Sequence, residues 1–368
     1  MEHSSSTENE MNQDKLLFNL EKLAQKAQSK NKDKPFQVLV HSEKHNLHFS
    51  FPAIQTNPIF HIASIGKLLT TVLILQAVET KKLALEDKLS DYLDAALLAG
   101  LFKSNPNEIT ILDCLSHRSG VADFFEGKDK NGKTFLNMIM ENPDTNWTQI
   151  MLLDHVRNNM KPVGNRGEKF AYGDTGFLLV SMVLEKIESK LLNQLLDEQI
   201  FYPLGMKNTQ SMIYKYLTEL RKVLRKVPQE IWLDHHEVRS FAILSVDQAD
   251  GGIVSTPEDL ILFQQAFHGG RLINQEHYDL MQKWQGKFRA GIHYGTGMMQ
   301  LHFNEFFFLM RNFPKLVGHI GVLATHCFYD QENDIHYIIN CGSTQNMTSS
   351  FILLSNMVGL IKSSLSSK

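Results

Sequence analysis

Cysteine is scarce in this chain, which contains only Cys114, Cys327 and Cys341 among 368 residues. Three cysteines without regular spacing form neither a disulfide framework nor a zinc-binding pattern. We therefore expect reduced thiols, as in a cytoplasmic protein. The adjacent pair His235 and His236 has no third ligand at a metal-binding spacing, so we expect no metal and no cofactor.

A strong net charge and long apolar runs are also missing. The net charge is −3, which gives no electrostatic reason to expect nucleic acid as a partner. No apolar run reaches the length of a membrane span, and the polar first ten residues lack the apolar core of a secretory signal. We expect a cytoplasmic protein with a disordered tail over residues 1–12 and a solvated, basic surface helix over residues 215–226. The sequence leaves the oligomeric state open.

Hydrophobic periodicity predicts a mixture of helices and antiparallel strands. Residues 14–29 have helical spacing, and two short apolar runs over 36–41 and 46–51 predict a β-hairpin. Thr256 and Pro257 are typical of a helix start. Near the C-terminus the pattern predicts an antiparallel meander over residues 297–303, 306–312, 322–329 and 335–341, followed by a helix over 350–364.

The stretch Ser64-Ile65-Gly66-Lys67 precedes an apolar run over residues 68–78, which predicts a buried helix. Residues three apart share one face of a helix, so the Ser64 hydroxyl and the Lys67 ammonium can meet. A serine at a helix N-terminus lies beside unpaired N–H groups and the positive end of the helix dipole, which favours a nucleophile and its oxyanion. Taken alone, this pattern is more often structural than catalytic, because serine is a common N-cap.

Two further motifs follow in order, Tyr172-Gly173-Asp174 and His319-Ile320-Gly321. Each motif is weak alone, but the ordered set is specific. Over about residues 35–345 the chain resembles the serine β-lactamase and penicillin-binding-protein superfamily, in its class C-like branch, which includes esterases, D,D-peptidases and D-aminopeptidases. Three more stretches support the resemblance, namely Leu115-Ser116-His117-Arg118-Ser119-Gly120, Pro203-Leu204-Gly205-Met206 and Gly251-Gly252-Ile253-Val254-Ser255-Thr256, and the last motif extends to Gly318-His319-Ile320-Gly321.

The resemblance implies an α+β fold in which helices flank an antiparallel sheet and an all-helical domain is inserted. Strand patterns at both ends of the chain agree with it. We expect a mixed domain from residues 13–85 and 245–368 and a helical domain over residues 86–244. The site would lie in the cleft between the two, with Ser64 at the start of the central helix.

The resemblance also implies roles for individual residues. Ser64 would be the nucleophile that forms an acyl-enzyme, and either Lys67 or Tyr172 would be its base. The backbone N–H groups of Ser64 and Val322 would form the oxyanion hole. Gly321 would let substrate lie along the strand edge. His117 lies in a structural box of the family, so we interpret it as a packing residue.

Three residues depart from the family pattern, namely Gly66, Asp174 and His319. Asp174 stands where asparagine is usual, and we consider three alternatives for it: an ion pair with Lys67, a position facing substrate amines, or a cap of the following helix. His319 stands where β-lactamases usually have lysine. We place Asp174, His319, Gly321 and Val322 at the substrate, and we expect His319 to change its charge near neutral pH.

The function that these features favour is a serine hydrolase acting on a small ester or amide, of the esterase or peptidase type. Alternatives within the resemblance are D,D-carboxypeptidase, D-aminopeptidase or β-lactamase activity. The alternative from another class is a catalytically weak binding or scaffold protein that retains the fold, which Gly66 and Asp174 favour.

Overall fold

The computed structural model of the chain describes residues 2–31, 33–52, 58–145, 147–212, 229–238 and 252–366. The segment expected as a basic surface helix, residues 215–226, lies outside these ranges. Within them, no helix combines the length and apolar character that a membrane span needs.

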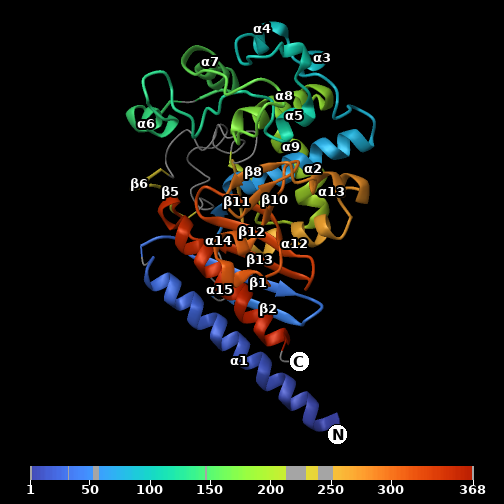
Figure 1. Cartoon of the computed structure of the whole chain (residues 1–368), viewed down its shortest axis with the longest axis vertical. Coiled ribbons are helices and arrows are strands. Elements are labelled where there is room, and N and C mark those ends of the chain that lie inside the picture. The colour runs from blue at the N-terminus through green and yellow to red at the C-terminus, as the bar shows by residue number, and fades with distance from the viewer. Residues whose placement is uncertain are drawn as a thin grey trace.

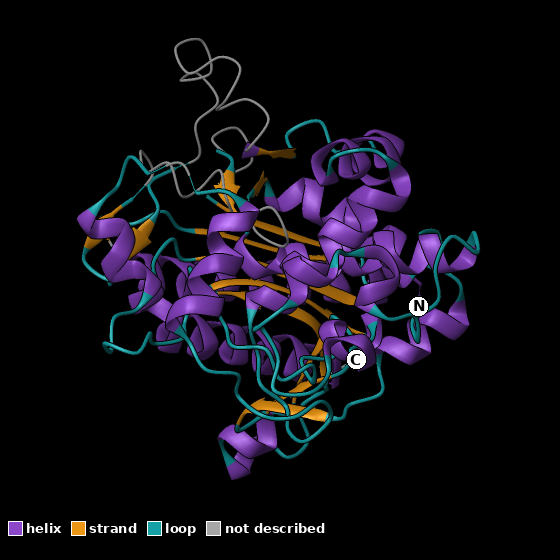
Figure 2. Cartoon of the chain, turned by 90° about the horizontal axis from the view of Figure 1, so that it is seen from above, coloured by secondary structure: helices purple, strands orange, loops and turns teal. Residues whose placement is uncertain are grey.

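An eight-stranded antiparallel sheet forms the centre of the molecule (Figure 1 and Figure 2). Its strand order is β2-β1-β13-β12-β11-β10-β9-β8. The strands are β1 (Gln37–Ser42), β2 (Leu47–Phe51), β8 (Gly286–Arg289), β9 (Ile292–Tyr294), β10 (Met299–Leu301), β11 (Leu316–Gly321), β12 (Thr325–Asp330) and β13 (Ile335–Asn340). The pairing of β1 with β13 joins the two ends of the chain in one sheet.

The expected N-terminal hairpin is confirmed, with Val40 opposite Phe49. Strands β10 and β13 lie within two of the four segments expected for the meander, and β12 overlaps a third and ends one residue beyond it. The fourth expectation, a strand over residues 306–312, is wrong. That segment contains the end of α14 (Phe303–Phe306) and a 3-10 turn (Phe308–Met310), with Phe308 and Leu309 about 70% exposed (70% and 72%). Its apolar run therefore lies on the surface, and β11 is the strand that continues the sheet.

Helices cover both faces of the sheet. Helices α1 (Glu2–Ser29) and α15 (Met347–Ser366) pack together over one face, beside the side chains of Val38 and Val40. Helix α12 (Pro257–His268) contacts β1 and β13 from the other side. On that side the Leu39 side chain belongs to a separate hydrophobic core. The expected start of α12 is confirmed, because the Thr256 side chain accepts a hydrogen bond from the Asp259 N–H.

Residues 2–12, expected as part of a disordered tail, form the first part of helix α1. The helix begins at Glu2 and not near residue 14. Leu16, Leu20 and Ala24 are buried at helical spacing, so packing against the sheet side of the molecule stabilises the segment. Propagation from this anchored part extends the helix through the polar residues before it.

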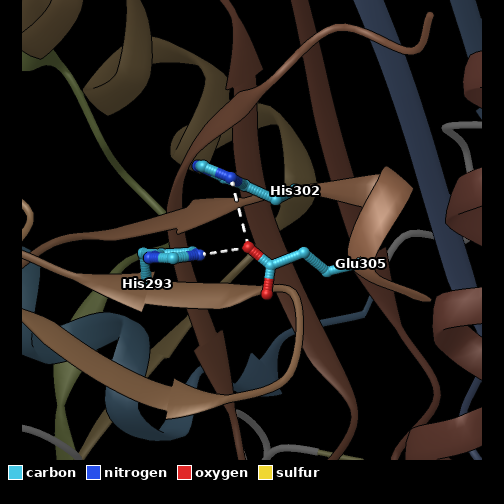
Figure 3. A group of neighbouring side chains, drawn as sticks. All are labelled: His293, His302 and Glu305. Carbon is cyan, nitrogen blue, oxygen red and sulfur yellow. Dashed lines mark hydrogen bonds and ion pairs between the residues drawn. The ribbon is translucent and has the colours of Figure 1, made fainter. Parts of the chain in front are cut away.

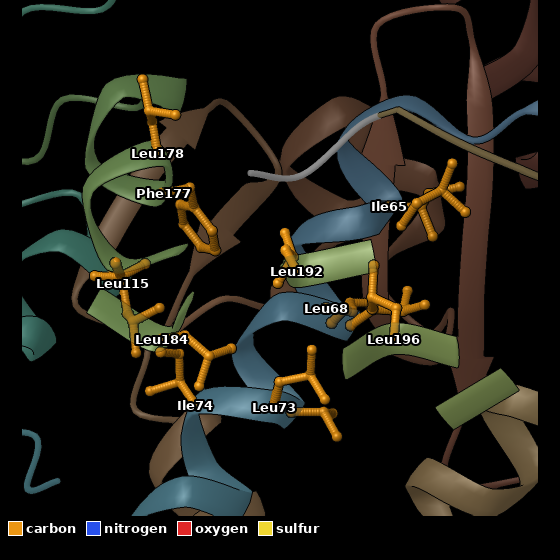
Figure 4. Packing of buried hydrophobic residues seen from close by; sticks show 14 of the residues in the cluster. Ile65, Leu68, Leu73, Ile74, Leu115, Phe177, Leu178, Leu184, Leu192 and Leu196 are labelled. Carbon is orange, nitrogen blue, oxygen red and sulfur yellow. The ribbon is translucent and has the colours of Figure 1, made fainter. Parts of the chain in front are cut away.

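The central helix α2 (Gly66–Glu79) follows a 3-10 turn over Ala63–Ile65. It is buried on nearly every side, as its apolar sequence predicts. Figure 4 shows Leu68, Leu73 and Ile74 of α2 among side chains of α5 (Ile111–Leu115), α8 (Asp174–Glu188) and α9 (Leu192–Leu196).

The remaining helices gather mainly above the sheet in Figure 1. They are α3 (Leu89–Tyr92), α4 (Ala95–Leu98), α6 (Phe135–Glu141), α7 (Gln149–Asn159), α10 (Tyr202–Leu204) and α13 (Gln275–Met281). Two small sheets add β3 (Phe60–His61), β7 (Ile253–Ser255) and β4 (Gln210–Ser211), and β5 (Trp232–Leu233) with β6 (His236–Glu237). Strand β4 pairs with β7 across the expected boundary at residues 244 and 245, and that division remains a prediction.

Candidate active site

Ser64 and Lys67 lie together at the start of the central helix. Ser64 is in the 3-10 turn, and Lys67 is in the first turn of α2. The Lys67 Nζ donates a hydrogen bond of 3.1 Å to the Ser64 Oγ. The Lys67 side chain is fully buried, so its charge acts at short range in a medium of low polarity.

The backbone before Ser64 is held in an unusual conformation. Ala63 has a φ of +50°, a region that a residue with a Cβ rarely occupies. Its N–H donates to the Nδ1 of His61 at 3.1 Å. The end of β11 packs closely against the same turn. A Cβ on Gly321 would lie 2.7 Å from the Ala63 Cβ and from the Ile62 carbonyl oxygen. Close packing therefore explains why a glycine stands at position 321. The expected contact of Gly321 with substrate stays a prediction.

Asp174 is the first residue of α8, whose N-cap is Gly173. Its carboxylate forms an ion pair with the ammonium of Lys67 inside the protein. The side chain does not cap α8, so that alternative is wrong, and the structure places Asp174 in the ion pair.

Tyr172 contacts both members of the serine–lysine pair. Its hydroxyl is hydrogen-bonded to the side chain of Ser64, and the Lys67 Nζ lies 5.1 Å from the centre of its ring. Burial raises the pKa of Tyr172 well above its usual value, and the negative charge of Asp174 raises it further. The hydroxyl is therefore protonated at neutral pH.

His319 lies in β11 and is fully buried. Its Nδ1 is 2.7 Å from the Ile320 carbonyl oxygen, to which it donates, and the Tyr294 hydroxyl lies 3.4 Å from Nε2. Burial, followed by the charge of Lys67, lowers the pKa of His319 to about 3. The expectation that His319 changes its charge near neutral pH is wrong, because a buried imidazolium beside a lysine is doubly disfavoured.

His117 is also buried, and its Nδ1 accepts a hydrogen bond from the Gly173 N–H at 3.3 Å. Its ring lies 4.5 Å from the ring of Tyr172 and 4.6 Å from the ring of Tyr294. These contacts agree with a packing role. They also position the turn that carries Tyr172 and Asp174.

A cavity of about 180 Å³ opens beside Ser64 and Tyr172. Val322, at the end of β11, lines the same cavity, so both expected oxyanion donors border one space. Within the lining, Glu126 adds a negative charge and Arg289 adds a positive charge. The rest of the lining is largely apolar and comprises Phe288, Ile292, Met299, Ile320, Thr344, Met347 and Phe351.

Sequence reasoning missed two carboxyl groups at this site. The Oδ1 of Asp123 accepts a hydrogen bond of 2.8 Å from the Asp174 N–H, and its Oδ2 accepts one of 2.7 Å from the Glu126 N–H. Burial and the neighbouring Asp174 raise the pKa of Asp123 to about 7 and also raise the pKa of Glu126. The only sequence signal was the spacing of these two acids shortly after the box at residues 115–120.

A serine–lysine pair at the start of a buried helix, packed against an antiparallel sheet, defines the class of β-lactamase-like proteins. The chain belongs to the Beta-lactamase family, whose sequence profile matches residues 49–356. The resemblance stated from the motifs is therefore confirmed, as is the mixed helix and antiparallel-sheet fold.

Individual relatives are distant. The chain is 24% identical to penicillin-binding protein 4* of Bacillus subtilis over 234 residues, which cover 60% of this chain and 48% of the relative. It is also 24% identical to the D-alanyl-D-alanine-carboxypeptidase/endopeptidase AmpH of Escherichia coli over 213 residues, which cover 58% and 50%. The chain thus spans about half the length of the curated relatives it matches.

Among solved structures, D-amino acid amidase from Ochrobactrum anthropi in complex with L-phenylalanine amide superposes with a TM-score of 0.74. The match covers 94% of this chain and 99% of the amidase at 18% identity. At this identity the likeness concerns the fold alone.

Proposed function

We propose that this protein is a serine hydrolase that forms an acyl-enzyme on Ser64 and acts on a small amide or ester with a protonated amino group near the scissile bond. The observation that carries the proposal is the composition of the cavity. It places Ser64 and Tyr172 beside the carboxylate of Glu126, and Asp123 and Asp174 lie directly behind.

The first step is attack of the Ser64 Oγ on the acyl carbon. The serine proton passes to a base, the bond from the carbonyl carbon to the leaving nitrogen or oxygen breaks, and the leaving group takes up a proton. Water then hydrolyses the ester on Ser64. The backbone N–H groups of Ser64 and Val322, which border one cavity, are the proposed donors to the oxyanion.

Tyr172 carries a proton in the resting site, because burial raises its pKa well above the usual value and the negative charges of three carboxyl groups raise it further. A substrate ammonium beside these carboxyl groups offsets their negative charge and lowers the pKa of Tyr172, so that the phenol can release its proton to solvent. We infer that the Tyr172 anion is then the base that takes the proton of Ser64 and that Lys67, whose Nζ lies 5.1 Å from the ring centre, stabilises this anion, so that a cationic substrate promotes its own acylation.

Arg289 supports a second candidate function, cleavage of a substrate that ends in a carboxylate, as a D,D-carboxypeptidase does. Its guanidinium borders the same cavity, and its charge acts on Glu126. Arginine binds carboxylates through two parallel hydrogen bonds. This candidate predicts turnover of an N-acylated peptide ending in D-Ala-D-Ala, which lacks the amino group that the first candidate requires.

The nucleophile is tested with a fluorophosphonate probe, a penicillin probe and intact-mass spectrometry. We expect a single adduct on Ser64 from at least one probe, and none on the Ser64→Ala protein. Ser349→Ala, at an exposed position of α15, is the matched control and should label normally. An intact fold with no adduct from either probe would support the binding or scaffold alternative, and an adduct on another residue would refute the assignment.

Substrate class is tested with pairs that differ by one charge, such as D-phenylalanine p-nitroanilide and its N-acetyl derivative, with matching p-nitrophenyl esters. The free amine should give a kcat/KM at least ~10-fold higher, which corresponds to about 1.4 kcal/mol. Glu126→Gln should reduce this ratio, whereas Glu141→Gln, which alters an exposed ion pair with Lys133, should not. Equal values for the two members of each pair would contradict the amine preference.

A further inference from the structure

Two histidines and a glutamate meet near the edge of the large sheet, and none of them lines the cavity beside Ser64 (Figure 3). His293 belongs to β9, His302 directly follows β10, and Glu305 lies in α14. One nitrogen from each ring and one carboxylate oxygen lie within 4.8 Å of one another. The pair His235 and His236, on which the expectation of no metal rested, is separate and lies at β6.

The distances from the carboxylate to the two rings are close to those between ligands of one small cation, while the rings themselves are stacked with their centres 4.1 Å apart. The Oε1 of Glu305 is 3.6 Å from the Nδ1 of His302 and 2.7 Å from the Nε2 of His293. Two ligands at about 2.0–2.1 Å from one zinc ion in tetrahedral geometry lie about 3.3 Å apart. The first distance already fits, and the second must open by about half an ångström, which a small rotation of either side chain provides.

A second set of contacts orients the ligands. The Nε2 of His302 is 2.6 Å from the Oε1 of Gln300, an acceptor, so the ring carries its proton on Nε2. This leaves the lone pair of Nδ1 directed toward Glu305, the arrangement that metal-binding histidines usually have.

A lysine already binds the other oxygen of the same carboxylate. The Lys287 Nζ lies 2.7 Å from the Oε2 of Glu305 and neutralises its charge. The Lys287 side chain is 56% exposed, so it can move into solvent at little cost.

We propose that His293, His302 and Glu305 form a binding site for a divalent cation of the zinc type, with water in the remaining positions. Two imidazoles and one carboxylate form a ligand set that suits Zn²⁺. The ion would bind Oε1 of Glu305 and compete with the ammonium of Lys287 on Oε2 for the charge of the same carboxylate.

The site would stiffen one wall of the cavity that holds Ser64. The Gly291 N–H donates to the Oε2 of Glu305 at 3.1 Å, and the His302 N–H donates to the Gly291 carbonyl at 2.8 Å. Gly291 lies in the β8–β9 turn at a φ of +72°, where a Cβ would meet the Phe306 ring at 2.5 Å. The same turn carries Arg289 and Ile292, which line the cavity. A bound cation would therefore fix the position of Arg289.

Binding is measured on the full chain after removal of metal with a chelator, by calorimetric titration with Zn²⁺ and by the visible absorption of bound Co²⁺. We expect one equivalent of Zn²⁺ per chain and a rise in melting temperature. His302→Asn and Glu305→Gln should each weaken binding at least ~10-fold. Absence of binding at about 100 μM Zn²⁺, a typical weak-site concentration, would overturn the proposal.

Control variants separate this group from other histidines. His277, whose Nδ1 is 2.9 Å from the Oε1 of Glu79, forms a histidine–glutamate pair without a second ring, so His277→Asn should bind normally. The Nδ1 atoms of His41 and His48 lie 3.2 Å apart and form the main competing pair. Zinc that persists in His302→Asn but is lost in His48→Asn would place the ion there and refute the proposal.

Lys287→Met provides a test that does not depend on weakening the fold. Its side chain is largely exposed, so the substitution should leave stability nearly unchanged. Because the ammonium competes with the cation, removing it should tighten Zn²⁺ binding several-fold. A cluster of hydrogen bonds without a metal role would show no such gain, and unchanged or weaker binding would count against the site.

Discussion

Asp174 places one negative charge beside both candidate bases. It forms an ion pair with Lys67 and raises the pKa of Tyr172. Asp174→Asn removes the charge, so the pKa of Tyr172 falls and Lys67 loses its counter-ion. With an uncharged ester, kcat/KM should rise, by less than about tenfold for each unit by which the Tyr172 pKa falls, because the anion becomes more abundant but less basic. The alkaline rise of the pH profile should move to lower pH.

The same substitution lowers stability, since removing one partner of a buried ion pair costs about 3–5 kcal/mol. Rates are therefore compared well below the melting temperature of the variant. Glu188→Gln, which alters an ion pair between Glu188 and the partly exposed Lys82, is the matched control and should leave the profile unmoved. A stable Asp174→Asn protein with an unchanged or slower rate would contradict the proposed effect of this charge.

His319 should not contribute to the pH dependence of activity near neutrality. Its pKa of about 3 keeps the ring neutral between about pH 5 and 8. His319→Asn preserves an amide near the position of Nδ1, and we expect a pH profile of the same shape with a lower maximum. Loss of a limb between pH 5 and 8 in the variant would show that His319 titrates there.

At the scale of elements, β11 supports the turn that carries Ser64. A Cβ on Gly321 would lie 2.2 Å from the Oγ1 of Thr325 and 2.7 Å from the Ala63 Cβ, so Gly321→Ala must displace β11 from the turn. We expect a loss of about 1–3 kcal/mol in stability from overpacking and a fall of about 10²-fold in acylation rate. Rapid-quench acylation and urea unfolding measure the two effects.

Gly164→Ala is the matched control, because its Cβ would meet no atom closer than 3.4 Å. It should preserve both the acylation rate and the stability. If Gly321→Ala acylates at the wild-type rate, the close contact of β11 with the Ser64 turn is not needed for activity.

Elements with strong local signals were predictable from the sequence. The cap formed by Thr256 and the following Pro257 specifies the start of α12, and alternation over 36–51 specifies the hairpin of β1 and β2. The segment 306–312 was not predictable, because its aromatic run fits a strand as well as an exposed turn. The exposure of this segment at the surface, which the local pattern does not reveal, distinguishes the turn from a strand.

The candidate site was predictable where its residues lie in motifs, as Ser64 and Tyr172 do. Asp123 and Glu126 reach the site from a loop whose path depends on packing against α8, which no local pattern encodes. The group formed by His293 and His302 was not predictable for the same reason, because the pairing of β9 with β10 brings the two residues together.

At the scale of the whole molecule, buried neutral histidines make the fold sensitive to acid. Burial lowers the pKa to about 4 in His61 and His336 and to about 3 in His319 and His326. In the unfolded chain these rings take up protons near pH 6.5, so the unfolded state binds more protons as pH falls below that value. Asp123, with a pKa raised to about 7, acts in the opposite direction, as do Glu126, Asp259 and Asp330, whose pKa values burial also raises.

The free energy of unfolding should therefore be highest above about pH 6.5 and should fall steadily as pH decreases toward 4. His326 isolates one contribution, because its Nε2 is 2.7 Å from the Oγ of Ser350 and a glutamine amide can keep that contact. At pH 5, protonation of this histidine stabilises the unfolded state by about 2 kcal/mol. His326→Gln removes that contribution, so the variant should lose less stability than the wild type between pH 8 and pH 5. Urea unfolding followed by circular dichroism at both pH values measures the difference. Equal losses in the two proteins would show that His326 is protonated in the native fold, contrary to its burial.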